Sequence, residues 1–151
     1  MRFPRPTRRG EAGQAAVEFA LTIVFLMLLI VGFVELIMML HTYNVIADSA
    51  KEGVRYAIVH GAANTGGCGP ASCTAITGAA GTGVVKTYAQ YSLHDTSSMT
   101  VSVDYTTGNV AACNKSPCLV GVTVSYVYQP FFGLGWPTVT VNAAAKGRII
   151  F

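Results

Sequence analysis

The hydrophobic pattern of the N-terminal third of the chain changes once, near His41. Residues 19–40 are apolar on almost every side of a helix, and Glu35 is the only charged residue among them. About 20 such residues suffice to cross the hydrocarbon core of a bilayer, so the pattern predicts one transmembrane helix at about 19–40. A core helix of a soluble protein is the less favoured alternative, because a helix that is apolar all round needs protein or lipid on every side.

Beyond this span, the chain keeps a helical period but becomes amphipathic. Apolar residues recur at steps of three and four on one face: Tyr43, Ile46, Ala47, Ala50, Gly53, Val54, Ala57 and Ile58. No proline interrupts residues 14–60, so one continuous helix is predicted there, with a projecting half at 41–60. Its small apolar residues suit packing against a sheet of the same subunit or against helices of neighbouring subunits, and both alternatives stay open.

The remaining residues, 61–151, are predicted to form a small β-rich head. Residues 61–83 are rich in glycine and read as a loop, and residues 84–93 read as a short second helix. Apolar and polar residues alternate in three later segments, near 99–105, 120–128 and 138–145, which indicates strands with one apolar face. Such a sheet needs a cover, and the projecting half supplies one. We therefore expect an α+β fold: a long N-terminal transmembrane helix that extends into a head with a three- to four-stranded antiparallel sheet.

The charge distribution predicts the orientation of this helix. The chain has 151 residues, of which 52% are hydrophobic and 11% charged, with a net charge of +3. Arginines cluster before the span, at Arg2, Arg5, Arg8 and Arg9, and the next basic residue is Lys51. The positive-inside rule then places the N-terminus in the cytoplasm, the span in the inner membrane, and the head in the periplasm or outside the cell. Because the basic charge belongs to this tail, a nucleic-acid partner is excluded.

The cysteines lie in the compartment where disulfides persist. They fall into two close pairs, Cys68 with Cys73 and Cys113 with Cys118. Three connectivities are possible, and the two local ones are favoured because Gly and Pro residues between the partners can reverse the chain. Zinc is the less favoured alternative, since the two pairs are far apart in the sequence and the compartment is oxidising.

Candidate catalytic groups do not converge in the sequence. The histidines, His41, His60 and His94, are scattered, and Asp95 and Asp104 are the only carboxylates of the head beyond the long helix. This pattern is typical of surface histidines and solvated acids rather than of a triad or a metal cluster. We expect no enzyme activity, no cofactor and no metal site.

The segment that joins the tail to the span carries the most specific motif. It reads Gly13-Gln14-Ala15-Ala16-Val17-Glu18-Phe19. This arrangement resembles the class III signal sequence of type IV pilin-like precursors. The resemblance implies that residues 1–13 are a leader, that a prepilin peptidase cuts after Gly13, and that Gln14 becomes the new amino terminus. From the residues alone, an uncleaved signal anchor remains the alternative.

Two further runs extend the resemblance to the TadE-like family. These are residues 13–21, followed by Glu35 near the outer end of the span, and residues 50–57. The resemblance covers residues 8–57 well, and in the head it rests only on 120–128 and 143–148. It implies a pseudopilin or minor pilin of the tight-adherence (Tad, or Flp) pilus, acting in pilus assembly, adhesion and surface attachment with other pilin subunits as partners. The alternative is an uncleaved, signal-anchored binding module outside the cytoplasm.

The resemblance also implies roles for individual residues. Glu18, Phe19 and Glu35 are the candidate residues for subunit assembly. A carboxylate near the bilayer centre costs about 2.5 kcal/mol or more, and in pilin-like families the partner of such a glutamate is the new amino terminus of an adjacent subunit. Glu35 is predicted to lie close enough to the outer interface to reach water. The apolar loop at residues 130–137 either contacts another surface or folds over its own sheet.

Overall fold

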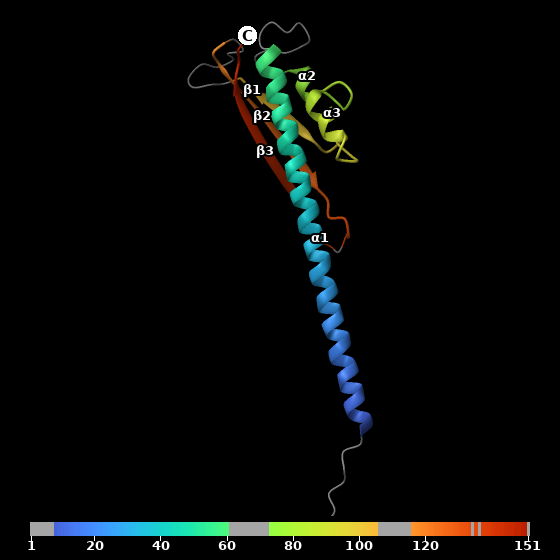
Figure 1. Cartoon of the computed structure of the whole chain (residues 1–151). Helices are drawn as coiled ribbons and strands as arrows, with labels where there is room; N and C mark the ends of the chain where they lie inside the picture. The colour runs from blue at the N-terminus through green and yellow to red at the C-terminus, as the bar shows by residue number, and fades with distance from the viewer. Residues whose placement is uncertain (1–7, 61–72, 106–115, 134, 136, 151) are drawn as a thin grey trace, which may run out of the picture. The chain divides into compact units, whose positions relative to one another are not determined.

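The computed structural model describes residues 8–60, 73–105, 116–133, 135 and 137–150. The chain divides into two compact units, Met1–Met38 and Met39–Phe151. The helix α1, Arg8–His60, is 53 residues long and contributes to both (Figure 1). It ends at the predicted residue but begins six residues earlier than the expected start at Gln14. The helix can extend into the predicted leader because Glu11 and Ala12 are good helix formers and no proline follows Pro6 there.

In the first unit, α1 is apolar and its side chains are almost all exposed from Gly13 onward. It is the one described helix that is long and apolar enough to cross a membrane. A helix of a soluble protein with this composition would be buried. The chain therefore has the features of a single-pass membrane anchor.

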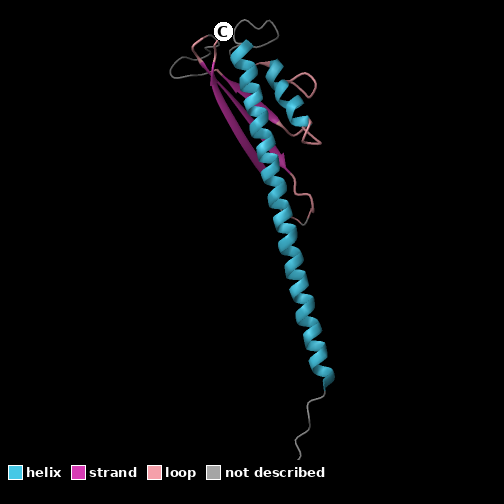
Figure 2. Ribbon diagram, viewed as in Figure 1, coloured by secondary structure: helices cyan, strands magenta, loops and turns pink. Residues whose placement is uncertain are grey.

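In the second unit, the elements follow each other as a pair of short helices and then a sheet. The helices are α2, Thr74–Thr77, and α3, Val84–Gln90. The strands β1, Thr100–Asp104, β2, Leu119–Tyr128, and β3, Val139–Arg148, form an antiparallel sheet in the order β1-β2-β3 (Figure 2). The α+β layout and the antiparallel sheet are confirmed.

The register places the predicted apolar positions side by side. Val122 lies opposite Val103 on β1 and Ala145 on β3, and Val124 lies opposite Val101 and Ala143. Because side chains alternate along a strand, these residues share one face. The opposite face is polar and mostly exposed: Thr100, Ser102, Asp104, Thr123, Thr140, Asn142, Lys146 and Arg148.

The apolar face of the sheet is covered by the projecting half of α1, as the pattern predicted. Ile46, Ala50, Val54 and Ala57 are buried in one cluster with Val122 and other strand residues. The short helices join the same cluster through Ile76, Val85 and Ala89. Of the two packing alternatives for the projecting half, the structure therefore shows packing against the sheet of the same subunit.

Two glycines allow the close approach of α1 to its neighbours. A Cβ at Gly53 would lie 2.6 Å from Val85 Cγ2 on α3 and 3.2 Å from Val122 Cγ1 on β2. A Cβ at Gly147, on β3, would lie 2.7 Å from Val54 Cγ1. At both points the backbone of the glycine packs directly against a neighbouring valine side chain. A residue larger than glycine would prevent this close packing.

Candidate functional site

The predicted processing and assembly residues lie on the exposed surface of α1. Gly13, Gln14, Glu18 and Phe19 are all exposed, Phe19 by 68%. No atom outside the local helix backbone lies within 4 Å of the position that a Cβ at Gly13 would occupy. Gln14 and Glu18 are four residues apart and therefore share one side of the helix. The segment is sterically open to another protein.

The local backbone at Glu18 is regular helix. The hydroxyl of Thr22 donates a hydrogen bond to the carbonyl oxygen of Glu18 at 2.8 Å. This hydrogen bond involves the main-chain carbonyl of Glu18 and not its side-chain carboxylate. In lipid, that carboxylate is costly without a cation, so Glu18 is expected either to pair with a cation or to stay at the headgroups.

Glu35 departs from its prediction. Its side chain is 3% exposed and takes part in an interaction within the protein. The expectation that Glu35 reaches water was therefore wrong. A buried carboxylate is tolerated when polar partners compensate for its lost hydration, and helix periodicity alone cannot reveal such partners. A role of Glu35 in subunit contact stays a prediction.

The polar face of the projecting half forms local ion pairs. Lys51 Nζ lies 2.8 Å from Asp48 Oδ1, and Arg55 Nη1 lies 3.2 Å from Glu52 Oε2. The hydrogen bond to Asp48 raises the pKa of the Lys51 ammonium. Exposed pairs of this kind contribute little to stability, and both lie on the solvent-exposed face of the projecting half.

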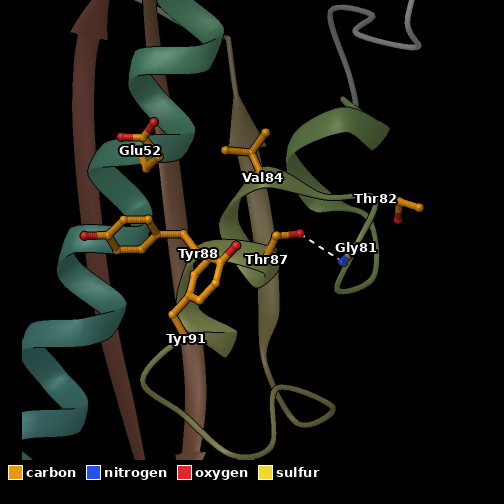
Figure 3. Close-up of a pocket in the computed structure, with 7 residues that line it drawn as sticks. All are labelled: Glu52, Gly81, Thr82, Val84, Thr87, Tyr88 and Tyr91. Atoms are coloured by element: carbon orange, nitrogen blue, oxygen red, sulfur yellow. Dashed lines mark hydrogen bonds between the residues drawn. The ribbon is translucent and has the colours of Figure 1, made fainter.

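A shallow depression lies where α1 meets α3, and the sequence carried no signal for it. It is lined by Glu52, Tyr88, Tyr91 and threonines of the α2–α3 region (Figure 3). Two of its polar groups are engaged: Thr87 Oγ1 accepts a hydrogen bond from Gly81 N–H at 2.9 Å, and Glu52 pairs with Arg55.

Among the described residues, no group of three or more His, Cys, Asp or Glu side chains could hold a metal ion. Cys73 is buried and, like Cys118, is disulfide-bonded. Cys68 and Cys113 lie outside the described residues. The pairing of the four cysteines therefore stays a prediction.

The apolar loop at residues 130–137, which we call the aromatic loop, is exposed wherever the structure describes its side chains beyond Pro130. Phe131 is 74% exposed and Phe132 43%, and their rings meet edge to face with centroids 5.2 Å apart. Gly133 and Gly135 have positive φ angles of 56° and 76°, which favour glycine. Of the two alternatives predicted for this loop, folding over the sheet does not hold for Phe131.

A second depression, which is more polar, lies at the end of β2. Thr42 of α1, Asp95, Ser97, Tyr126, Tyr128 and Gln129 line it. The Asp95 carboxylate accepts hydrogen bonds from the Ser97 backbone N–H at 2.7 Å and its hydroxyl at 2.9 Å, which lower the pKa of Asp95. These hydrogen bonds close a local turn, so they account for the position of the Asp95 side chain without a bound ligand.

Comparison with known proteins adds one finding. A family model described as TadE-like protein matches residues 13–55. The resemblance predicted from the sequence is confirmed over this segment, which includes the motif around Gly13 and the projecting half up to Arg55. No curated protein and no solved structure matches the chain significantly.

Proposed function

From the TadE-like segment at residues 13–55, which associates the chain with the Tad pilus, we propose that this protein is a pseudopilin or minor pilin that acts in pilus assembly and adhesion. The observation that carries the proposal is the combination of that match with an exposed Gly13–Phe19 motif on a helix that can cross a membrane. The protein works by packing with other subunits, and no catalytic step is assigned to it.

The assembly mechanism follows from the cost of charge in lipid. The arginine-rich tail holds the N-terminus in the cytoplasm, and prepilin peptidase cuts after Gly13 at the membrane surface. The new amino group of Gln14 is a cation, and Glu18 of an adjacent subunit is an anion in need of one. Pairing between them sets the axial register of neighbouring helices, while Phe19 supplies apolar contact area beside the pair.

The substitution Gly13→Ala tests the processing step. The structure leaves open space around Gly13, so the added methyl group perturbs no packing and alanine also favours the helix. In cells with active peptidase, the wild-type protein should lose the mass of residues 1–13, and the variant should keep it. Intact-mass spectrometry of the purified protein measures this directly.

The matched control is Gly10→Ala, the same substitution three residues earlier in the leader, which should be processed normally. An intact Met1 or Arg2 end on the wild-type protein in the same cells contradicts the proposal. That result, together with release by detergent as a monomer free of pilins, would identify an uncleaved anchor that displays a binding module.

A further inference from the structure

In the aromatic loop, Phe131 presents apolar surface that the described residues of its own subunit leave exposed. Phe131 is 74% exposed, although a phenylalanine is usually buried. No charged residue occurs at positions 130–137. The edge-to-face pair of Phe131 and Phe132 is therefore an exposed apolar tip on a tight, glycine-containing turn.

Contacts within the second unit place this tip at the beginning of the projecting half. Near the middle of β2, Val122 lies against the position of Gly53 on α1. At the end of β2, Tyr128 and Gln129 line one depression with Thr42. The distances along the two elements are similar. The six residues from Val122 to Tyr128 on β2 span about 20 Å, and the eleven residues from Gly53 to Thr42 on α1 span about 16 Å. β2 therefore runs back along α1 toward the outer end of the predicted span, and residues 130–133 follow directly.

We propose that Phe131 and Phe132 insert into the headgroup region of the outer leaflet of the membrane that α1 crosses. The predicted span ends near residue 40, two residues before Thr42, and Thr42 belongs to the same unit as the aromatic loop. The loop therefore follows the part of α1 where lipid headgroups are expected to begin. Phenylalanine is among the apolar side chains that interfacial segments bury about 5–10 Å into the boundary between headgroups and acyl chains. This inference rests on the anchor topology of the proposed function.

Tryptophan fluorescence in vesicles tests the inference. The chain has a single tryptophan, Trp136. A variant with Trp136→Phe and Phe131→Trp moves the probe to position 131. The full-length protein is reconstituted at low density into phosphatidylcholine vesicles, with or without lipids brominated near the headgroup end of the acyl chains. We expect blue-shifted emission, quenching by the brominated lipids and little quenching by aqueous acrylamide.

The matched control moves the same probe to another exposed aromatic position of the head. In a variant with Trp136→Phe and Tyr91→Trp, the probe replaces a tyrosine that is 87% exposed and lies beside Glu52, ten helical residues beyond Thr42. It should emit as in water and be quenched by acrylamide. This comparison separates a membrane contact of the aromatic loop from a general attraction of the head to lipid.

The outcomes distinguish this inference from the proposed function. If the probe at 131 is quenched by acrylamide and not by brominated lipid while the protein floats with the vesicles, the inference is overturned and the anchor stands. Protection from both quenchers means that the loop is covered by protein, such as another subunit, and also overturns it. Failure of the protein to float with the vesicles overturns the anchor and the inference together.

Discussion

The most informative single residue in the core is Tyr105. It is 1% exposed, and its hydroxyl has no hydrogen-bond partner among the described residues. An unpaired buried polar group costs about 1–3 kcal/mol, because its bonds to water are lost on folding. Burial also raises the pKa of this tyrosine above its ordinary value. Alternation along the strand predicted that Tyr105 points inward, but it could not predict whether its hydroxyl would find a partner.

The substitution Tyr105→Phe should leave the thermal midpoint at neutral pH unchanged or raise it, because only the unpaired hydroxyl is removed. Since the folded-state pKa is raised, the unfolded chain ionises first, and the wild-type protein loses stability as the pH rises above about 10. The midpoint difference in favour of the variant should therefore widen above that pH. Thermal unfolding of the detergent-solubilised full-length chain at both pH values measures it.

The control is Tyr91→Phe, at a position that is 87% exposed, which should change neither the midpoint nor its pH dependence. A clear loss of stability in Tyr105→Phe at neutral pH would mean that the hydroxyl is paired after all.

At the scale of elements, the three strands and α3 were predicted and α2 was missed. Alternation located all three strands to within a few residues, because one face of each packs on the core. α2 lay inside a segment predicted as loop, and α3 ends at Gln90 rather than Leu93. A helix of four residues has no periodicity to detect. It forms because Ile76 is buried in the head core, which is a tertiary effect.

The substitution Gly53→Ala tests the contact between α1 and the head. Alanine normally stabilises a helix by about 1 kcal/mol relative to glycine. Here its Cβ would lie 2.6 Å from Val85 Cγ2, and overpacking of this kind costs about 1–3 kcal/mol. We expect a net loss that lowers the thermal midpoint by several degrees, at about 4–8 °C per kcal/mol for a domain of this size.

Gly13→Ala is the matched control, because it makes the same change in the same helix where no neighbour lies within 4 Å. It should not lower the midpoint. A double-mutant cycle with Val85→Ala should show that Gly53→Ala is less harmful when the valine is shortened. Equal effects in both backgrounds would contradict the packing explanation.

At the scale of the whole molecule, the candidate anchor and the TadE-like segment could be predicted from the sequence, whereas the exposure of Phe131 and the burial of Glu35 needed the structure. Hydrophobic periodicity and charge asymmetry are properties of the amino-acid sequence, so they can be recognised without a structure. The burial of Glu35 and the exposure of Phe131 depend on the packing around each side chain, which hydrophobic periodicity does not reveal. The same limit applies to subunit assembly, which depends on a partner chain.

The substitution Glu18→Gln tests assembly without removing the anchor. The amide cannot pair ionically with a neighbouring amino terminus, so the protein should insert and be processed but be lost from filaments. Immunoblots of sheared surface filaments and of the membrane fraction measure both. Glu11→Gln is the control, because that carboxylate belongs to the leader that is predicted to be removed. Normal recovery of Glu18→Gln in filaments would reject the ionic pairing.

The meander order of the sheet bears on how the head matures. Each strand pairs with its neighbour in sequence, and the cover of the sheet, residues 41–60, is synthesised before any strand. In the orientation proposed above, residues 41–60 reach the far side of the membrane before β1 emerges. Each new strand can therefore pack at once against the apolar face of residues 41–60. This shortens the time during which partly folded states expose hydrophobic surface and can aggregate. The head can fold vectorially, in the order in which it is translated.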